Sequence, residues 1–189
     1  MSEGQDEKNI FIETLEWICN KLDLANIPYM ITGGSALGFW GHIRTTIDID
    51  IVIQINKETI DSFLKSIENE AYIDFQKAKE AVFKRRIFNI IFNKTCFKID
   101  LISLKEDVYE REKFKNRIKI KFQNKEIFVI SPEDLIISKL YWNKSVGGSE
   151  RQIKDCESIY RLNHEDLDLN YIEKWVRMLK VKDQFDKLL

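Results

Sequence analysis

The sequence predicts an α+β fold, in which a mixed β-sheet flanked by helices is followed by a helical C-terminal region. Short apolar runs with the spacing of strands, such as residues 47–55 and 97–102, recur in the first part of the chain. Segments with apolar residues at helical spacing lie between these runs. From residue 131 onward only helical patterns remain. We therefore expect residues 1–130 to form the core and residues 131–189 a helical region packed on it.

The first half of the chain alternates helical and strand patterns. Residues 8–25 carry apolar residues at helical spacing, and Pro28 follows as a stop signal. Asn56 is a typical N-cap for a helical pattern that ends near residue 69. The expected elements are, in order, a helix over 8–25, a strand over 29–32, a glycine turn with a helical stretch over 36–40, a strand over 47–55, a helix over 56–69 and a short strand over 71–75.

Two hairpins and a set of helices are expected in the second half. Apolar runs on both sides of Asn93 predict a hairpin over 81–104, and a second hairpin over 117–130 follows a helical segment at 106–115. The Ser131–Pro132 pair, with acids directly after it, predicts a helix start. Helical patterns then cover residues 135–142, 149–162 and 170–189.

Length, composition and charge are those of an ordinary soluble globular protein. The chain has 189 residues, of which 44% are hydrophobic and 32% are charged. This length allows one or two compact units. The net charge of -1 gives no general basic character, so any contact with a nucleic acid must come from a local basic patch.

The cysteines and the N-terminus indicate a reducing, cytoplasmic environment. Cys19, Cys96 and Cys156 are far apart and form no Cys-x-x-Cys pair, which argues against a disulfide framework and a zinc site. The N-terminal residues are acidic and lack an apolar core, and no segment has the length needed to span a bilayer. We therefore expect a cytoplasmic protein without membrane association.

The strand over residues 47–55 carries two carboxylates on one face. Asp48 and Asp50 are two positions apart, so their side chains point in the same direction. Like charges at this spacing disfavour joint ionisation unless a cation lies between them. Oxygen ligands of this kind suit Mg²⁺ or Mn²⁺, so the strand predicts a divalent metal site.

A glycine turn and a third carboxylate belong with this strand. Gly33, Gly34 and Ser35 follow the strand over 29–32, and glycines there let a phosphate group approach the backbone. Asp100 lies on the second arm of the first hairpin. Pairing of that arm beside the strand of Asp48 and Asp50 would complete the geometry of a shared metal site.

This combination resembles the nucleotidyltransferase superfamily of the DNA-polymerase-β type, whose signature is a Gly-Gly/Ser turn, an Asp-x-Asp strand and a distal acid on a neighbouring strand. The resemblance implies a nucleotidyltransferase-fold sheet and catalysis that depends on Mg²⁺ (or Mn²⁺). It implies that Asp48, Asp50 and Asp100 are catalytic metal ligands. It also implies that Gly33, Gly34 and Ser35 cradle the phosphates of an NTP substrate.

The later part of the chain resembles the AbiEii-type branch of that superfamily, the nucleotidyltransferases of prokaryotic abortive-infection and toxin–antitoxin systems. The similarity covers residues 28–162 and includes the Ser-Pro-Glu-Asp segment and the helix that follows Ser149. It implies that Lys139, Arg151 and Asp155 complete the nucleotide site and that a cognate toxin or antitoxin is a candidate partner. The branch usually has an aspartate where this chain has Ser158, which leaves the role of Asp155 open.

The same residues also have purely structural explanations. Lys139 could be a solvated lysine on an amphipathic helix. Arg151 and Asp155 are four positions apart and could form an ion pair on a helix surface. Arg44 lies in the loop before Asp48, where it either contacts phosphate or is a solvated loop residue.

We expect an enzyme that moves a nucleoside monophosphate from an NTP to a hydroxyl group of RNA, tRNA or a partner protein. A small-molecule (aminoglycoside-type) nucleotidyltransferase and a catalytically silent nucleotide-binding or antitoxin-like module remain as alternatives. The one clue to the acceptor is that Arg117, Lys119 and Lys121 should line one face of a strand. Such a stripe suits a nucleic-acid backbone, but basic residues also protect an edge strand from pairing.

Overall fold

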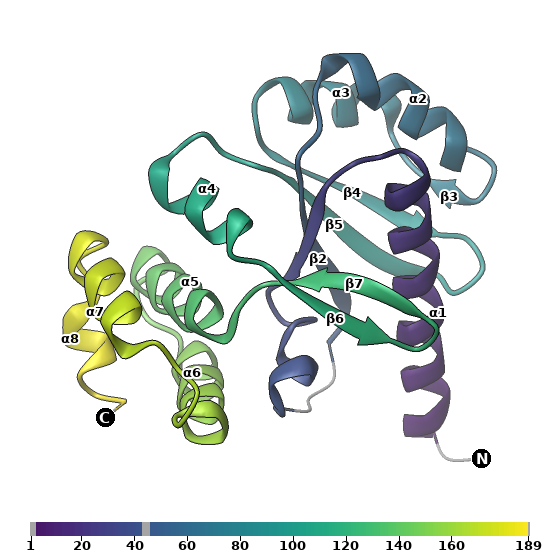
Figure 1. Ribbon diagram of the computed structural model, residues 1–189. Helices are drawn as coiled ribbons and strands as arrows, with labels where there is room; N and C mark the ends of the chain where they lie inside the picture. Colours follow the sequence, from purple (N-terminus) through teal and green to yellow (C-terminus); the bar gives the residue numbers. More distant parts are fainter. Residues whose placement is uncertain (1–2, 43–45, 189) are drawn as a thin grey trace.

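A seven-stranded mixed sheet with helices on both faces makes up the protein (Figure 1), as a computed structural model that describes residues 3–42 and 46–188 shows. The strand order is β3-β4-β5-β2-β1-β7-β6. The predicted α+β class is confirmed. The strands are β1 (Tyr29–Thr32), β2 (Asp48–Ile53), β3 (Ala71–Tyr72), β4 (Ile87–Phe92), β5 (Phe97–Ser103), β6 (Ile118–Phe122) and β7 (Lys125–Val129). The helices are α1 (Glu3–Leu24), the 3-10 helix η1 (Leu37–Trp40), α2 (Lys57–Ile67), α3 (Phe75–Phe83), α4 (Val108–Lys115), α5 (Pro132–Ser145), α6 (Glu150–Asn163), α7 (Leu169–Met178) and α8 (Lys182–Phe185).

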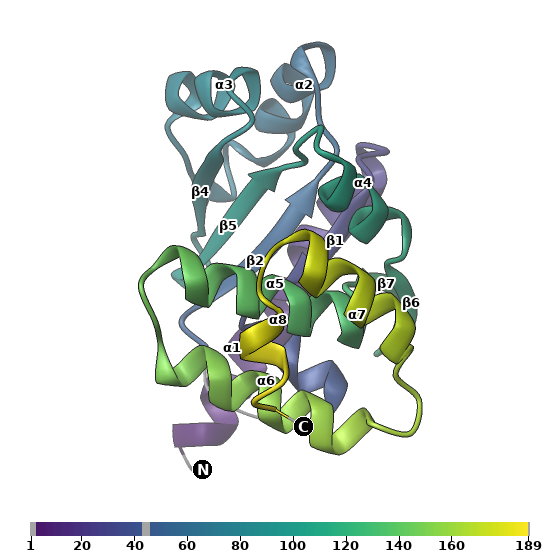
Figure 2. The same cartoon turned by 90° about the vertical axis from the view of Figure 1, so that its left-hand side faces the viewer.

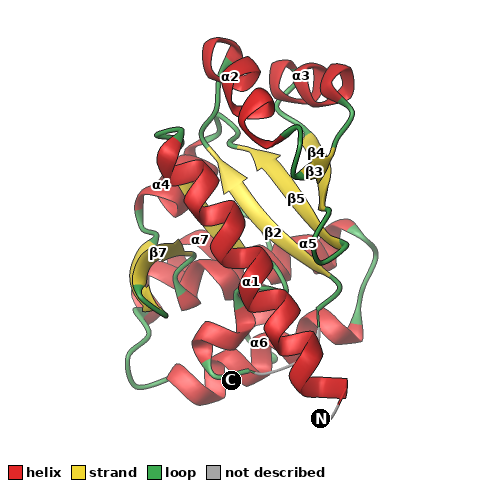
Figure 3. Ribbon diagram, turned by 90° about the vertical axis from the view of Figure 1, so that its right-hand side faces the viewer, coloured by secondary structure: helices red, strands yellow, loops and turns green. Residues whose placement is uncertain are grey.

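Helix α1 lies across one face of the sheet (Figure 3). Its apolar stripe is fully buried, and Trp17 at its edge stacks on Phe92 with 4.2 Å between ring centroids. Phe11 of the same helix contacts Phe97 of β5. Since alternate residues of a strand face opposite sides, the side chains of Asp48 and Asp50 on the neighbouring strand point away from α1.

The C-terminal helices lie on the face opposite α1, and they cover it only in part (Figure 2). Helices α5 to α7 pack beside the region of β1 and β2, whereas β4 stays uncovered on this side. Ile87 and Ile91 of β4 are 55% and 39% exposed, although both are large apolar residues. The face of the sheet that bears the aspartates is therefore closed toward β1 and open toward β4.

Hydrogen bonds join Trp40, at the end of η1, to the residue after β7 and to α6. The indole Nε1 of Trp40 donates to the carbonyl oxygen of Ile130 over 3.0 Å, and Nδ2 of Asn163 donates to the carbonyl oxygen of Trp40 over 3.1 Å. These bonds hold η1 against the end of α6. The junction predicted at residues 130 and 131 falls between β7 and α5. The division of the chain into two domains at that point stays a prediction.

Two predicted helix starts are confirmed by their capping bonds. The side chain of Asn56 accepts from the backbone N–H of Thr59 over 3.0 Å, and the side chain of Ser131 accepts from that of Asp134 over 3.1 Å. Each bond satisfies one of the free donors at a helix N-terminus. Among the helices of the described residues, none is both long and apolar enough to cross a membrane.

The structure differs from the sequence prediction in three places. Residues 75–83 form a helix, whereas we expected a strand to end at residue 75 and a hairpin to begin at residue 81; Asp74 caps the helix, and Ala78 and Val82 are buried on one side of it. The helical stretch after the glycine turn is only a four-residue 3-10 helix. The last predicted helix is divided into α7 and α8, because Lys180 has a left-handed φ of 58° that ends α7.

Candidate active site

Three carboxylates meet on the face of the sheet opposite α1. Strands β2 and β5 pair in parallel, and their register places Asp50 directly beside Asp100 and Asp48 beside Lys98. One carboxylate oxygen from each of Asp48, Asp50 and Asp100 lies within 4.8 Å of the others. All three residues are half-buried. Residues that are far apart in sequence thus form the cluster that the sequence predicted.

The glycine turn fixes the position of Asp50. The backbone N–H of Gly34 donates to Oδ2 of Asp50 over 3.3 Å, and the backbone N–H of Asp50 donates to Oγ of Ser35 over 3.1 Å. The Ser35 hydroxyl in turn donates to the carbonyl oxygen of Thr32 over 2.8 Å. In this structure Gly34 and Ser35 therefore position Asp50 by direct hydrogen bonds. Their contact with nucleotide phosphates stays a prediction.

Ionising the carboxyl group of Asp50 costs free energy in the folded protein. Burial, followed by the negative charge of Asp48, raises the pKa of Asp50 to about 6. The N–H of Gly34 and the positive charge of Lys139 act in the opposite direction and favour the charged form. A divalent cation beside Asp50 would remove the cause of this shift, since it would offset both the burial and the repulsion.

Three residues that the sequence analysis did not assign to the site hold the other two carboxylates. Nζ of Lys98 donates to Oδ2 of Asp100 over 2.8 Å, and Nδ2 of Asn89 donates to Oδ1 of Asp100 over 2.7 Å. The hydrogen bond from Lys98 to Asp100 is the main reason that the pKa of Lys98 is raised. Thr46 donates to the backbone oxygen of Asp48 over 3.0 Å.

Lys139 lies in a buried ion pair that approaches the aspartates from α5. Its Nζ donates to Oδ2 of Asp155 over 2.8 Å and to Oε1 of Gln152 over 3.2 Å. The side chains of Lys139 and Asp155 are only 5% and 2% exposed. Nε2 of His42 is 3.3 Å from the other oxygen of Asp155. The alternative of a solvated helix lysine is therefore wrong for Lys139.

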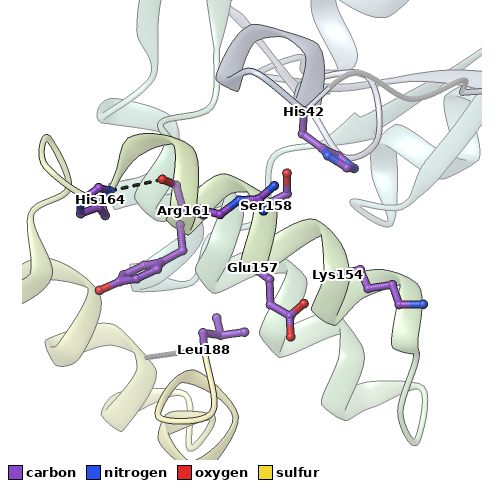
Figure 4. Close-up of a pocket in the computed structure, with 8 residues that line it drawn as sticks. His42, Lys154, Glu157, Ser158, Arg161, His164 and Leu188 are labelled. Carbon is purple, nitrogen blue, oxygen red and sulfur yellow. Dashed lines mark hydrogen bonds between the residues drawn. The ribbon is translucent and has the colours of Figure 1, made fainter.

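A pocket lies beside α6, and one of the residues that line it, His42, also contacts this ion pair. The pocket has a volume of about 680 Å³ and is lined by His42, Lys154, Glu157, Ser158, Tyr160, Arg161, His164 and Leu188. Figure 4 labels Lys154, Glu157, Ser158 and Arg161 along α6, together with His42 from the segment that follows η1. His42 thus lines the pocket and also contacts Asp155.

Several predicted basic residues lie elsewhere or have other partners. Arg151 is exposed in the first turn of α6, and Arg44 lies outside the described residues. On β6 the predicted stripe is interrupted, because the Arg117 guanidinium stacks over Phe114 and Phe128. Lys119 forms an ion pair with Glu126 over 2.9 Å. Strand β6 is an edge of the sheet, where such residues discourage pairing with another chain.

The residues present fit a Mg²⁺ or Mn²⁺ ion. Three carboxylates offer the hard oxygen ligands that these ions prefer, and they project from paired strands that fix their spacing. The raised pKa of Asp50 and the ammonium group beside Asp100 both show a cluster that requires positive charge. The metal-ligand role of the three residues is supported by this chemistry and stays a proposal.

We expect Gly33→Ala to disturb the cluster severely. Gly33 has a φ of +61°, and an added Cβ would lie 2.1 Å from Oδ2 of Asp50. The carboxylate must move, so Mn²⁺ affinity should fall at least about tenfold, and stability should fall by about 1–2 kcal/mol. Gly38→Ala is the matched control, since its Cβ would meet nothing within 4 Å. Equal Mn²⁺ titrations of the two variants would contradict the tight fit of the turn against Asp50.

Solved structures with the same fold include several nucleotidyltransferases. An antigenic nucleotidyltransferase-like protein from Paracoccidioides brasiliensis is 16% identical with a TM-score of 0.57, covering 100% of this chain and 94% of its own. The antibiotic-resistance factor ANT(2'')-Ia in complex with adenylyl-2''-tobramycin is 13% identical with a TM-score of 0.58, covering 90% and 97%. The lincosamide antibiotic adenylyltransferase LnuA is 11% identical with a TM-score of 0.53, covering 79% and 96%. At these identities the similarity shows the fold alone.

Sequence comparison identifies the family directly. None of the curated proteins compared with the chain matches it in sequence. A family model described as "Nucleotidyltransferase of unknown function (DUF6036)" matches residues 9–186, which is nearly the whole chain. The predicted nucleotidyltransferase resemblance is thereby confirmed, whereas the AbiEii-type branch is not. The chain belongs to this nucleotidyltransferase family.

Proposed function

We propose that the protein transfers a nucleoside monophosphate from an NTP to an acceptor hydroxyl, with Mg²⁺ or Mn²⁺ held by Asp48, Asp50 and Asp100. The observation that carries this proposal is the meeting of the three carboxylates beside the glycine turn. The family and the fold of the similar structures support the same type of reaction. A chain that had lost activity would not be expected to keep all three acids in contact.

The proposed reaction forms one bond and breaks one. The acceptor oxygen attacks the α-phosphorus of the NTP, the bond from that phosphorus to the bridging oxygen of the β-phosphate breaks, and pyrophosphate leaves. A divalent ion, when bound, supplies positive charge for the triphosphate and acidifies the attacking hydroxyl. Asp100 would accept the proton of the hydroxyl, and the backbone of Gly33 and Gly34 would face the phosphates. Lys139, held by Asp155, would add a fixed positive charge near them.

Metal binding should weaken in acid because protons compete for Asp50. Its pKa of about 6 means that the carboxylate is largely ionised above this pH and largely protonated below it. We expect Mn²⁺ affinity to be constant between about pH 7 and 8 and to fall about tenfold for each unit below about pH 6. Calorimetric titrations across this range measure the effect. An affinity that stays constant down to pH 4.5 would contradict the raised pKa.

The direct test uses each α-labelled NTP with Mg²⁺ and three classes of acceptor. The first class, RNA and tRNA, and the second, protein from a cell extract, follow from the sequence prediction. Label on any acceptor that depends on Asp50 supports the proposal. Binding of NTP without transfer to any class would instead support a catalytically silent module. The same experiment with a purified candidate toxin or antitoxin tests the AbiEii-type relationship, which stays a proposal.

A small-molecule acceptor is the second candidate. The pocket of about 680 Å³ beside α6 contains none of the three carboxylates, so it does not locate the acceptor. The interrupted stripe on β6 removes part of the case for a nucleic acid. Two similar structures are of a lincosamide adenylyltransferase and of ANT(2'')-Ia with adenylyl-2''-tobramycin. Aminoglycosides and lincosamides therefore form the third class of acceptor in the labelling experiment.

A further inference from the structure

Lys98 joins two of the three carboxylates of the cluster. It stands two residues before Asp100 on β5, so both side chains project from the same face. The register of β2 and β5 places it beside Asp48. Its Nζ lies 2.8 Å from Oδ2 of Asp100 and 3.9 Å from Oδ2 of Asp48. One ammonium group thus contacts oxygens from both strands.

These contacts engage the oxygens that a metal ion would need. Oδ2 of Asp100 accepts from Lys98, while Oδ1 accepts from Asn89 over 2.7 Å. Asp100 therefore has both oxygens occupied by donors from the protein itself. The lysine side chain is 43% exposed, so it can turn into solvent without crossing packed side chains. Its flexible four-carbon stem allows this movement.

We propose that Lys98 is a built-in counter-ion that competes with the divalent metal for the oxygens of Asp48 and Asp100. The inference rests on the proposed function, since it assumes that these carboxylates bind metal. In the metal-free protein Lys98 offsets their repulsion and positions Asp100. A metal ion must displace the ammonium group from the carboxylate oxygens. The ammonium group then stays nearby in solvent, and its positive charge opposes the metal.

This competition makes metal binding depend on the nucleotide. A positive charge 2.8 Å from the carboxylate of Asp100 and 3.9 Å from that of Asp48 opposes a second cation strongly, even where solvent screens part of the interaction. An NTP brings several negative charges and changes that balance in favour of the metal. The free protein should therefore bind metal weakly, and the nucleotide and the metal should bind together. Lys98 is in this view a positioning residue that sets the order of loading.

Lys98→Met tests the proposal with two measurements on the whole protein. In EDTA the variant should unfold at a lower temperature than the wild type, because the carboxylates lose their counter-ion. In a calorimetric titration without nucleotide it should bind Mn²⁺ about 10- to 100-fold more tightly. A non-hydrolysable NTP should then increase its Mn²⁺ affinity by a smaller factor than in the wild type. Mn²⁺ affinity that is unchanged or weaker in the folded variant would overturn the proposal.

Two further variants control the interpretation. Lys119→Met removes a lysine with a similar ion pair on the far edge of the sheet, 53% exposed, and should leave Mn²⁺ affinity unchanged. Lys98→Arg keeps the positive charge and should bind Mn²⁺ no more tightly than the wild type; tighter binding would overturn the proposal. If Lys98→Met does not fold, Lys98→Gln replaces it in the same titrations with the same expected results.

Asp50→Asn separates failure of this inference from failure of the proposed function. If Asp50→Asn loses Mn²⁺ binding but Lys98→Met has wild-type affinity, the metal site stands and the role of Lys98 is wrong. If Asp50→Asn binds Mn²⁺ as the wild type does, the metal does not bind at this cluster and the proposed function itself fails.

Discussion

Replacing Asp50 by Asn should abolish nucleotidyl transfer, with a loss of at least about a thousandfold in rate, while the metal-free protein becomes more stable. The loss is expected because the variant lacks one of three clustered oxygen ligands, and about 4 kcal/mol of transition-state stabilisation corresponds to this factor. Asparagine keeps an oxygen that can accept from the N–H of Gly34. The turn should therefore stay in place.

The gain in stability should depend on pH in a defined direction. The pKa of Asp50 is raised from its ordinary value of 3.8 to about 6, so ionising the carboxylate destabilises the folded state. Between these two values the folded protein binds the extra proton, and stability falls as pH rises. Asp50→Asn should thus be stabler by about 1–3 kcal/mol at pH 7, and the difference should vanish near pH 4. Urea unfolding in EDTA, at pH 7 and near pH 4, measures the difference in stability between Asp50→Asn and the wild type.

Asp61→Asn is the control for this substitution. Asp61 pairs with Lys79, lies on α2 and has a side chain that is 58% exposed. The control should keep both activity and stability within about 0.5 kcal/mol. Transfer that survives in Asp50→Asn at a near wild-type rate would contradict the proposed site.

Replacing Lys139 by Met should have the second largest effect, on stability and on NTP affinity together. The substitution removes a buried cation 2.8 Å from Asp155, whose side chain is 2% exposed, and buried charges that lose a partner are costly. We expect a loss of about 3 kcal/mol in unfolding free energy. The loss of positive charge near Asp50 should also weaken NTP binding by about 1–3 kcal/mol.

The two effects of Lys139→Met are separated by measuring binding on folded protein. Calorimetry with a non-hydrolysable NTP, well below the unfolding temperature, reports affinity alone. Lys144→Met is the matched control, since Lys144 lies on the same helix, is exposed and donates to the backbone oxygen of Lys180. If Lys139→Met is destabilised but binds NTP as the control does, the lysine only supports the packing of α5 and α6.

Several parts of the carboxylate cluster could be predicted because they follow from local rules. The two-residue period of a strand places Asp48 and Asp50 on one face, and a short turn brings the hairpin arm of Asp100 back along its neighbour. The glycine turn is recognisable because few other residues tolerate its backbone. Gly33 shows this directly with its positive φ. These features depend on residues that are close in sequence, whereas the parallel pairing of β2 with β5, which brings Asp100 beside Asp50, joins segments that are far apart in sequence.

The surroundings of the cluster depend on packing between distant segments. Asn89 reaches Asp100 only because the β4–β5 hairpin has its particular register, which the sequence did not define. His42 meets Asp155 because η1 packs on α6, and Gln152 meets Lys139 because α5 packs on α6. Lys98 had a usable signal, since it stands two residues before Asp100 and must share its face.

The burial of Lys139 also had a signal in the sequence. Ile136, Ile137 and Leu140 surround it on α5, and all three are fully buried. Apolar residues on several sides of a helix indicate that it is covered on several sides, so a lysine among them is not solvated. The missed helix α3 has a different cause. Its residues Ala81 and Val82 precede an apolar run, and the strand pattern of that run extends over them.

The uneven covering of the sheet defines a direction of approach to the cluster. Since α5 to α7 close the side of β1 and β2, an acceptor would reach Asp100 across β4, over Ile87, Asn89 and Ile91. That route requires no helix to move. Two exposed isoleucines on either side of a polar asparagine favour a flat, partly apolar acceptor group over a densely charged one. The size of the acceptor on this side would then not be limited by the dimensions of an enclosed cavity, because only the two-residue strand β3 follows β4 in the sheet.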